Sequence, residues 1–263
     1  MNSANNELRL MIAIAVNLLL VFSSYRFVEK KTNRAGWSAA MDVLLLNYLV
    51  QYVAVCGLGL LGILNFTTLY ATATVAAMVM FYFGRAIRRD IQKDSNLDRF
   101  FVGGCALLLI GYFAGLINVV GISPVIGDDA LMYHLPMPAI WLHAHRLTFF
   151  TTWFSNPANS YSPLAAETFI AWLMAPTNND LLAHFVQMPA MVLIYFASVE
   201  LLVAAGALPR TAALISAGAL LSRPFISQSF LVKDDLFVAA FFMVMLAGCA
   251  NDRLQDRLGP WRI

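Results

Sequence analysis

Long apolar runs are the feature of this sequence that most constrains its fold. The chain has 263 residues, of which 60% are hydrophobic and only 12% charged, whereas a soluble domain carries about a quarter charged residues. A transmembrane helix needs ~20 consecutive, mostly apolar residues. Seven runs reach or approach that length, namely 8–27, 40–63, 66–84, 100–123, 181–206, 211–229 and 235–250. The sequence therefore predicts an all-α polytopic membrane protein with about seven transmembrane helices.

Lysine and arginine fall between these runs in a pattern that predicts their orientation. With seven spans, the main basic groups share one side, namely residues 26–34, residues 85–99, Arg210 and Arg253 to Arg262. Cytoplasmic loops carry an excess of lysine and arginine, so we expect this side to face the cytoplasm. The outer side, the periplasm of a bacterium, then holds the N-terminus, a tight turn near Asn65, the long segment 124–180 and a short turn at 230–235.

This pattern divides the chain into three parts. Residues 1–99 form a three-helix membrane region with basic cytoplasmic loops, residues 100–250 form a core with both outer segments, and residues 251–263 form a cytoplasmic tail. Segment 124–180 is too long for an idle connection and is rich in aromatic residues. Its stretches 135–147 and 164–174 have helical patterns, and we expect both to lie along the outer membrane surface as amphipathic helices.

Two acidic doublets mark the outer side of the predicted bundle. Asp128-Asp129 opens the long segment, and Asp234-Asp235 lies in the second turn. Ionisable residues beside membrane segments are candidates for function, but acids also suit the first turn of a helix, and both interpretations remain open. For Glu167 the simpler interpretation is a local salt bridge or helix cap. The four histidines lie on the outer side without the spacing of a complete zinc ligand set.

A string of residues at the first doublet resembles a known family. Gly127 to Pro136, GDDALMYHLP, followed by Trp141-Leu142, resembles the first outer loop of GT-C-fold glycosyltransferases, in the branch around protein O-mannosyltransferases and aminoarabinose transferases. In that branch an Asp-x-x-x-Tyr-His-Leu-Pro string opens a loop with a surface helix. Residues 162–167 resemble the start of the next helix, and residues 233–236 resemble the second acidic turn.

The resemblance covers about residues 100–250, and the family differs from this chain in two respects. Its acidic loop commonly follows the first span, whereas three predicted spans precede it here. Its core usually continues for many more spans. We therefore expect the chain to be an N-terminal portion of such an enzyme.

The resemblance implies transfer of a sugar from a polyprenyl-phosphate carrier to an acceptor on the outer side, with inversion at the anomeric carbon. A hydroxyl that attacks this carbon loses its proton, which a carboxylate can accept as general base. Asp129 occupies the position of the family's acid and is our first candidate for this base, with Asp128 second. The donor phosphate needs a cation to neutralise it, for which the candidates are Arg223, Lys233 and Arg146.

The remaining site candidates are substrate-binding residues, namely Tyr133, His134, Asp234, Asp235 and Glu167. Asp129 and Asp235 are also candidate ligands of a divalent cation, because such ions take oxygen ligands. The expected partners are the lipid bilayer, the polyprenyl-phosphate sugar and a glycan, lipid or protein acceptor, and no nucleic acid. The expected location is the inner cell membrane. The alternative function is a non-catalytic membrane fragment or subunit that binds lipid carriers or partner helices.

Overall fold

The computed structural model describes residues 3–32, 37–84, 128–149 and 164–258, together with 103, 104, 106–108, 110–112, 114 and 115. In these residues every regular element is helical, which confirms the predicted all-α class. The helices are α1 (Ser3–Thr32), α2 (Trp37–Leu60), α3 (Phe66–Phe83), α5 (Pro136–Ala144), α6 (Leu164–Met174), α7 (Met188–Ala204), α8 (Pro209–Leu220), α9 (Arg223–Ser229) and α10 (Asp235–Leu258). A π-helical turn, η1 (Ala130–His134), precedes α5, and a 3₁₀ turn, η3 (Ala183–Phe185), precedes α7.

Four of the predicted spans appear as helices long and apolar enough to cross a membrane. These are Asn5–Lys31, Ala39–Leu60, Phe66–Phe83 and Ala183–Ala204. The predicted span 100–123 lies largely outside the described residues, although those described between 103 and 115 are helical. The apolar helices indicate a membrane protein, but the described residues do not confirm seven spans.

The predicted span over residues 211–229 is not one continuous helix, and a crossing by this segment is not confirmed. This stretch forms two helices, α8 and α9, and Ser222 between them has extended backbone with φ −66° and ψ 149°. Pro224 lies in the first turn of α9, where its missing N–H is tolerated, whereas in a continuous helix it would remove a backbone hydrogen bond. Neither helix reaches the ~20 residues that a span needs. The last predicted span does begin at Asp235, but α10 runs on to Leu258, into the predicted tail.

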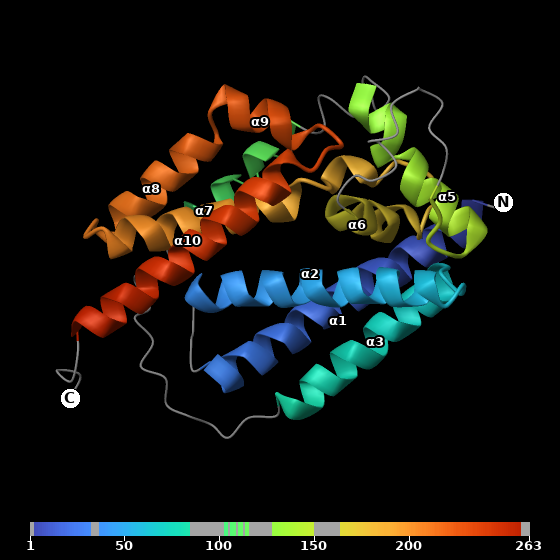
Figure 1. Ribbon diagram of the computed structural model, residues 1–263, viewed down its shortest axis with the longest axis horizontal. Coiled ribbons are helices and arrows are strands. Elements are labelled where there is room, and N and C mark those ends of the chain that lie inside the picture. Colours follow the sequence, from blue (N-terminus) through green and yellow to red (C-terminus); the bar gives the residue numbers. More distant parts are fainter. Residues whose placement is uncertain are drawn as a thin grey trace.

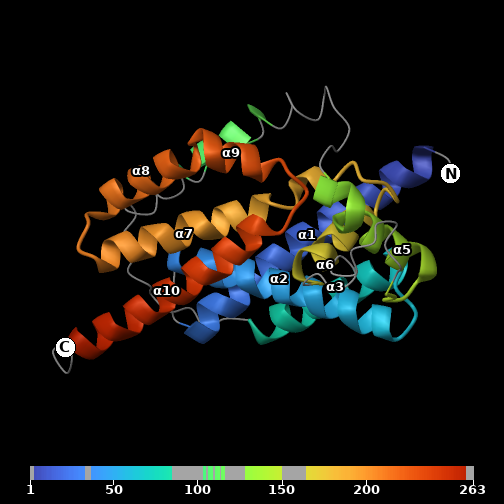
Figure 2. The same ribbon diagram turned by 45° about the horizontal axis from the view of Figure 1, so that its top comes forward.

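Helix α2 lies between two groups of helices (Figure 1). Helices α1 and α3 pack against it and against each other, and α2 also contacts α6 and α7. In Figure 2, α10 runs beside α7, and α8 and α9 lie above them. Tyr48 of α2 joins the groups, because its hydroxyl donates to Ala165 O of α6 at 2.7 Å and its ring lies 5.5 Å from that of Phe237 in α10.

Segments that were predicted to share one side of the membrane do gather at one end of the bundle. Leu64 N–H, in the turn between α2 and α3, donates to His145 O at 2.8 Å, and Leu147 N–H donates to Gly59 O at 3.0 Å. Near the start of α1, the Arg9 guanidinium carbon lies 5.2 Å from the centre of the Phe66 ring. These contacts bring the segments together at one end of the bundle, in agreement with the predicted grouping. That this end faces the cell exterior stays a prediction.

Helix α6 differs from the predicted surface helix because it is enclosed by the protein. Residues 166–172 are all buried, and α6 packs against α2 and α5. The physical reason is that its sequence, LAAETFIAWLM, has no polar face, and a helix that is apolar all round is buried. Helix α5, in contrast, buries Trp141 and Leu142 while His143 is exposed, as an amphipathic helix should.

Candidate functional site

The two acidic turns meet in the folded chain. Lys233, in the turn before α10, places its Nζ 2.8 Å from Oδ2 of Asp129, which directly precedes η1. Figure 1 shows the chain between α9 and α10 beside η1. The hydrogen bond with Asp129 raises the pKa of Lys233, and the negative charges of Asp235 and Asp128 act in the same direction. The structure therefore brings both doublets to one place.

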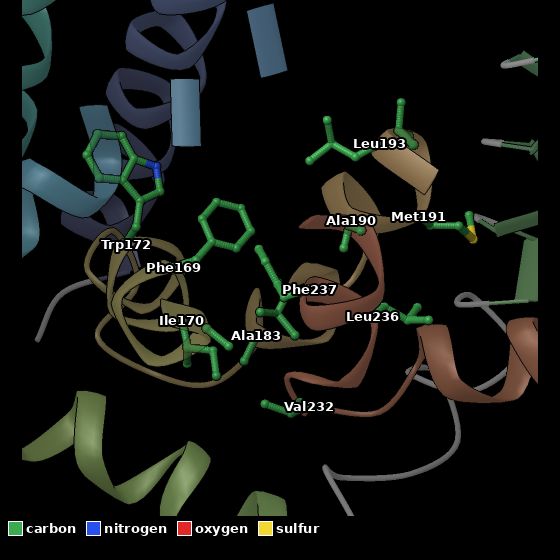
Figure 3. Close-up of a cluster of buried hydrophobic side chains, with 14 of the residues drawn as sticks. Phe169, Ile170, Trp172, Ala183, Ala190, Met191, Leu193, Val232, Leu236 and Phe237 are labelled. Atoms are coloured by element: carbon green, nitrogen blue, oxygen red, sulfur yellow. The ribbon is translucent and has the colours of Figure 1, made fainter. Parts of the chain in front are cut away.

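The second turn is held in position by apolar residues on either side of its charges (Figure 3). Val232, Leu236 and Phe237 are buried, and the Phe237 ring lies 5.9 Å from that of Phe169 in α6. Lys233 lies between these anchors and remains partly exposed. Packing of the core thus fixes the place of the charged pair.

The π-helical turn η1 positions the Tyr133-His134 pair. Leu135 N–H donates to Ala130 O at 2.9 Å, a bond that spans five residues. Pro136 follows and has no N–H with which to continue an α-helical ladder. Turns of this kind are rare and frequently occur at functional sites. Here the wider turn leaves Ala130 and His134 buried.

A buried hydrogen-bonded pair joins η1 to α6. His134 Nδ1 lies 2.8 Å from Glu167 Oε1, and the two side chains are 1% and 0% exposed. Removing one partner of such a pair leaves an uncompensated buried group, which is strongly destabilising. Sequence reasoning named Glu167 as a substrate-binding candidate, with a local salt bridge or cap as the simpler interpretation, and did not predict its pairing with His134. The available signal was a lone acid in an otherwise apolar helix, which favours an inward-facing, paired carboxylate.

The other ring nitrogen of His134 faces the second turn. Its Nε2 lies 4.0 Å from Oδ1 of Asp234, whose side chain is 25% exposed. Nε2 is buried, and it makes no hydrogen bond with any residue that the structure describes. Glu167, His134 and Asp234 therefore form a row that leads from the core to the solvent edge, next to the pair of Asp129 and Lys233.

The pKa of Tyr133 reflects its burial and the negative charge around this row. Its ring centre lies 4.1 Å from that of His134. Burial raises the pKa of Tyr133 to about 12, and the negative charges of Asp129, Asp234, Glu167 and Asp235 add to the effect. All four carboxylates are therefore close enough to act on one phenol.

We expect Tyr133 to stay protonated well above the pH at which ordinary tyrosines ionise, which is about 10. Because its pKa is raised on folding, its contribution to stability is complete below pH ~10 and is lost as the pH rises through about 12. The measurement is a titration of tyrosinate absorbance, taken as the difference between the protein and its Tyr133→Phe variant. A difference titrating near pH ~10 would contradict the enclosed, carboxylate-rich site.

The other predicted site residues lie further from the centre. Asp128 is exposed, and Asp235 is exposed in the first turn of α10, where an acid suits the helix dipole. Both still act electrostatically on Lys233. Arg223 is exposed at the start of α9, and within the described ranges it forms no ion pair with the site. Arg146 is exposed just beyond the end of α5.

The arrangement does not fit the cation predicted between Asp129 and Asp235. The Lys233 ammonium lies against Asp129, at the position where a cation would bind. In the part of the chain that the structure describes, no group of three or more His, Cys, Asp or Glu side chains is arranged to hold a metal ion.

Comparison of the chain with protein-family models, with curated proteins and with solved structures gives no match. The resemblance to GT-C glycosyltransferases stays a prediction. A function for this site has to follow from its residues and their geometry.

Proposed function

We propose that this protein is an integral membrane glycosyltransferase of the GT-C type, which moves a sugar from a polyprenyl-phosphate carrier to an acceptor on the outer side. The observation that carries the proposal is the meeting of the two acidic turns, with Lys233 2.8 Å from Asp129 and Asp234 4.0 Å from His134. This places carboxylates and a cation together beside helices that are apolar enough to lie in lipid.

The chemistry of transfer needs both kinds of charge. The attacking hydroxyl gives up a proton, which a carboxylate can accept. The leaving phosphate gains negative charge as its bond to the sugar breaks, and a positioned cation stabilises that charge in the transition state. Lys233 is the cation of the site, and Asp129 and Asp234 are its two candidate bases. Before the donor arrives, Lys233 is held by Asp129.

A lipid-linked donor fits the exposed apolar side chains of the helices near the site. Apolar side chains remain exposed along several helices, including Leu18 of α1, Met78 of α3 and Phe242 of α10. Such large exposed apolar surfaces are typical of membrane or partner contact. A donor whose polyprenyl chain lies in the bilayer would present its phosphate and sugar at the end of the bundle where Lys233 lies.

Asp129→Asn is the first test of this function. The variant keeps the shape of the side chain but loses the charge that holds Lys233, so we expect transfer to fall at least ~10-fold. The measurement is sugar transfer by the purified chain in liposomes that contain a polyprenyl-phosphate sugar. Asp180→Asn is the matched control, because Asp180 is an exposed acid in the same outer segment.

Full activity of the Asp129→Asn variant would remove Asp129 from the mechanism. Absence of transfer by the unaltered protein, across a panel of lipid-linked sugars, would contradict the enzyme proposal. Tight binding of a lipid-linked sugar without turnover would instead favour the alternative, a non-catalytic carrier-binding protein.

A further inference from the structure

The row of Glu167, His134 and Asp234 contains one unexplained feature. His134 Nε2 is buried, faces a carboxylate at 4.0 Å and makes no hydrogen bond within the described residues. Most buried polar atoms in proteins have a hydrogen-bond partner, so each exception requires a reason. A nitrogen that takes up its partner only during a reaction provides such a reason.

Glu167 determines what this nitrogen can do. An ionised carboxylate only accepts hydrogen bonds, so with Glu167 ionised the Nδ1 of His134, which lies 2.8 Å from Glu167 Oε1, carries the proton. The hydrogen bond made by one ring nitrogen sets the state of the other. In the neutral imidazole, Nε2 therefore carries a lone pair, and this lone pair faces Asp234.

The two candidate bases, Asp129 and Asp234, differ in the group that lies next to each carboxylate. Asp129 is engaged by an ammonium group at 2.8 Å, and that group has no lone pair with which to take a proton onward. Asp234 is backed by an imidazole nitrogen that can accept one. A separation of 4.0 Å is longer than a hydrogen bond, but catalytic hydrogen bonds are often long in empty sites and shorten in the reacting complex.

From this geometry we infer that Asp234 accepts the proton of the incoming nucleophile and that His134 and Glu167 form a relay behind it. The inference rests on the proposed function and specifies how its base operates. As the acceptor oxygen bonds to the anomeric carbon, the bond from that carbon to the phosphate oxygen breaks, and its electron pair leaves with the polyprenyl phosphate. The acceptor's proton passes to Asp234 and on to Nε2 of His134. The resulting imidazolium lies between the carboxylates of Asp234 and Glu167, and the proton returns to solvent through Asp234.

This assignment gives the residues different roles. Asp234 is the catalytic residue, because it alone in the row touches the acceptor. His134 and Glu167 are positioning residues that act through it. Asp129 then serves to hold Lys233 until the donor phosphate arrives.

The experiment compares Asp234→Asn, His134→Gln and Glu167→Gln in the full chain, in liposomes with a polyprenyl-phosphate sugar. We expect kcat to fall by about 10²-fold in Asp234→Asn and by about 10-fold in the other two, with the KM for the donor unchanged. His143→Gln is the matched control, because His143 is exposed on α5 and unconnected to the row. Size-exclusion profiles and thermal unfolding in detergent verify that each variant is folded.

Chemical rescue separates a relay from a structural role. Added imidazole is expected to restore most of the lost activity in His134→Ala, and none in Asp234→Asn. The pH profile of kcat should also change in His134→Gln. The titratable and charged groups around the imidazole also affect this profile. They are Glu167 from α6, Asp234 and Lys233 from the second turn, and Asp129 and Tyr133 beside η1.

Three results would overturn the relay while leaving the proposed function intact. They are full activity of Asp234→Asn, no rescue of a folded His134→Ala variant that still binds the donor, and an unchanged pH profile in His134→Gln. If His134→Ala does not fold, the pH profile of kcat in His134→Gln tests the relay in its place. Absence of transfer by the unaltered protein is a different outcome, because it contradicts the glycosyltransferase itself.

Discussion

Replacing Lys233 with methionine is expected to lower sugar transfer by about 10²- to 10³-fold, the range found when one donor to developing charge is removed. Lys233 is the cation of the described site, 2.8 Å from Asp129, and two further acids, Asp128 and Asp235, act on it electrostatically. Without the ammonium, the leaving phosphate would develop its charge among carboxylates alone. Repulsion would then weaken donor binding and slow bond cleavage together.

Lys233→Arg is the matched control for this prediction. It keeps the positive charge and can still pair with Asp129, so most of the activity should remain. Stability should change little in either variant, because the pair is partly exposed and such pairs contribute about 0–1 kcal/mol. The measurement is kcat and the donor KM in liposomes. Equal activity of the methionine and arginine variants would show that the phosphate is neutralised elsewhere, with Arg223 the next candidate.

Trp172→Ala is expected to destabilise the protein by about 3–5 kcal/mol, the usual cost of removing a buried tryptophan. Trp172 is 1% exposed on α6, and its ring centre lies 4.8 Å from that of Tyr70 in α3. Its Nε1–H donates to Asn17 Oδ1 of α1 at 3.2 Å, and its backbone oxygen accepts from the Tyr70 hydroxyl. One side chain thus ties α6, and with it Glu167, to the N-terminal helices.

Two further variants separate packing from hydrogen bonding at this position. Trp172→Phe keeps a ring but loses the bond to Asn17, and should cost about 1 kcal/mol for that bond. Phe242→Ala removes a ring that is 60% exposed on α10 and should leave stability nearly unchanged. The measurement is unfolding of the detergent-solubilised protein by increasing denaturant. A Trp172→Ala loss no larger than that of Phe242→Ala would contradict the enclosed position of α6.

Residues close together in the sequence account for what could be predicted well. Apolar runs of adequate length gave four helices that match candidate spans, and α10 begins at the predicted Asp235. Asn65 and Thr68 form a capping box at the start of α3, which fits the predicted tight turn. Alternation of spans also placed the second acidic turn with the first, and the contact between Lys233 and Asp129 agrees with this. Each of these follows from local chemistry and from the length of a span.

Other features depend on contacts between distant segments, so only the tertiary structure decided them. Hydropathy alone could not distinguish a helix on the membrane from one inside the bundle, and α6 lies inside because α2 and α5 cover it. The pairing of His134 with Glu167 joins residues 33 positions apart and arises from that burial. The sequence by itself determined that the chain is helical and apolar and which acids share an end. Packing determined which acid is buried, which is bound by Lys233 and which faces the imidazole, because a carboxylate's role depends on the groups that the fold places within a few ångströms of it.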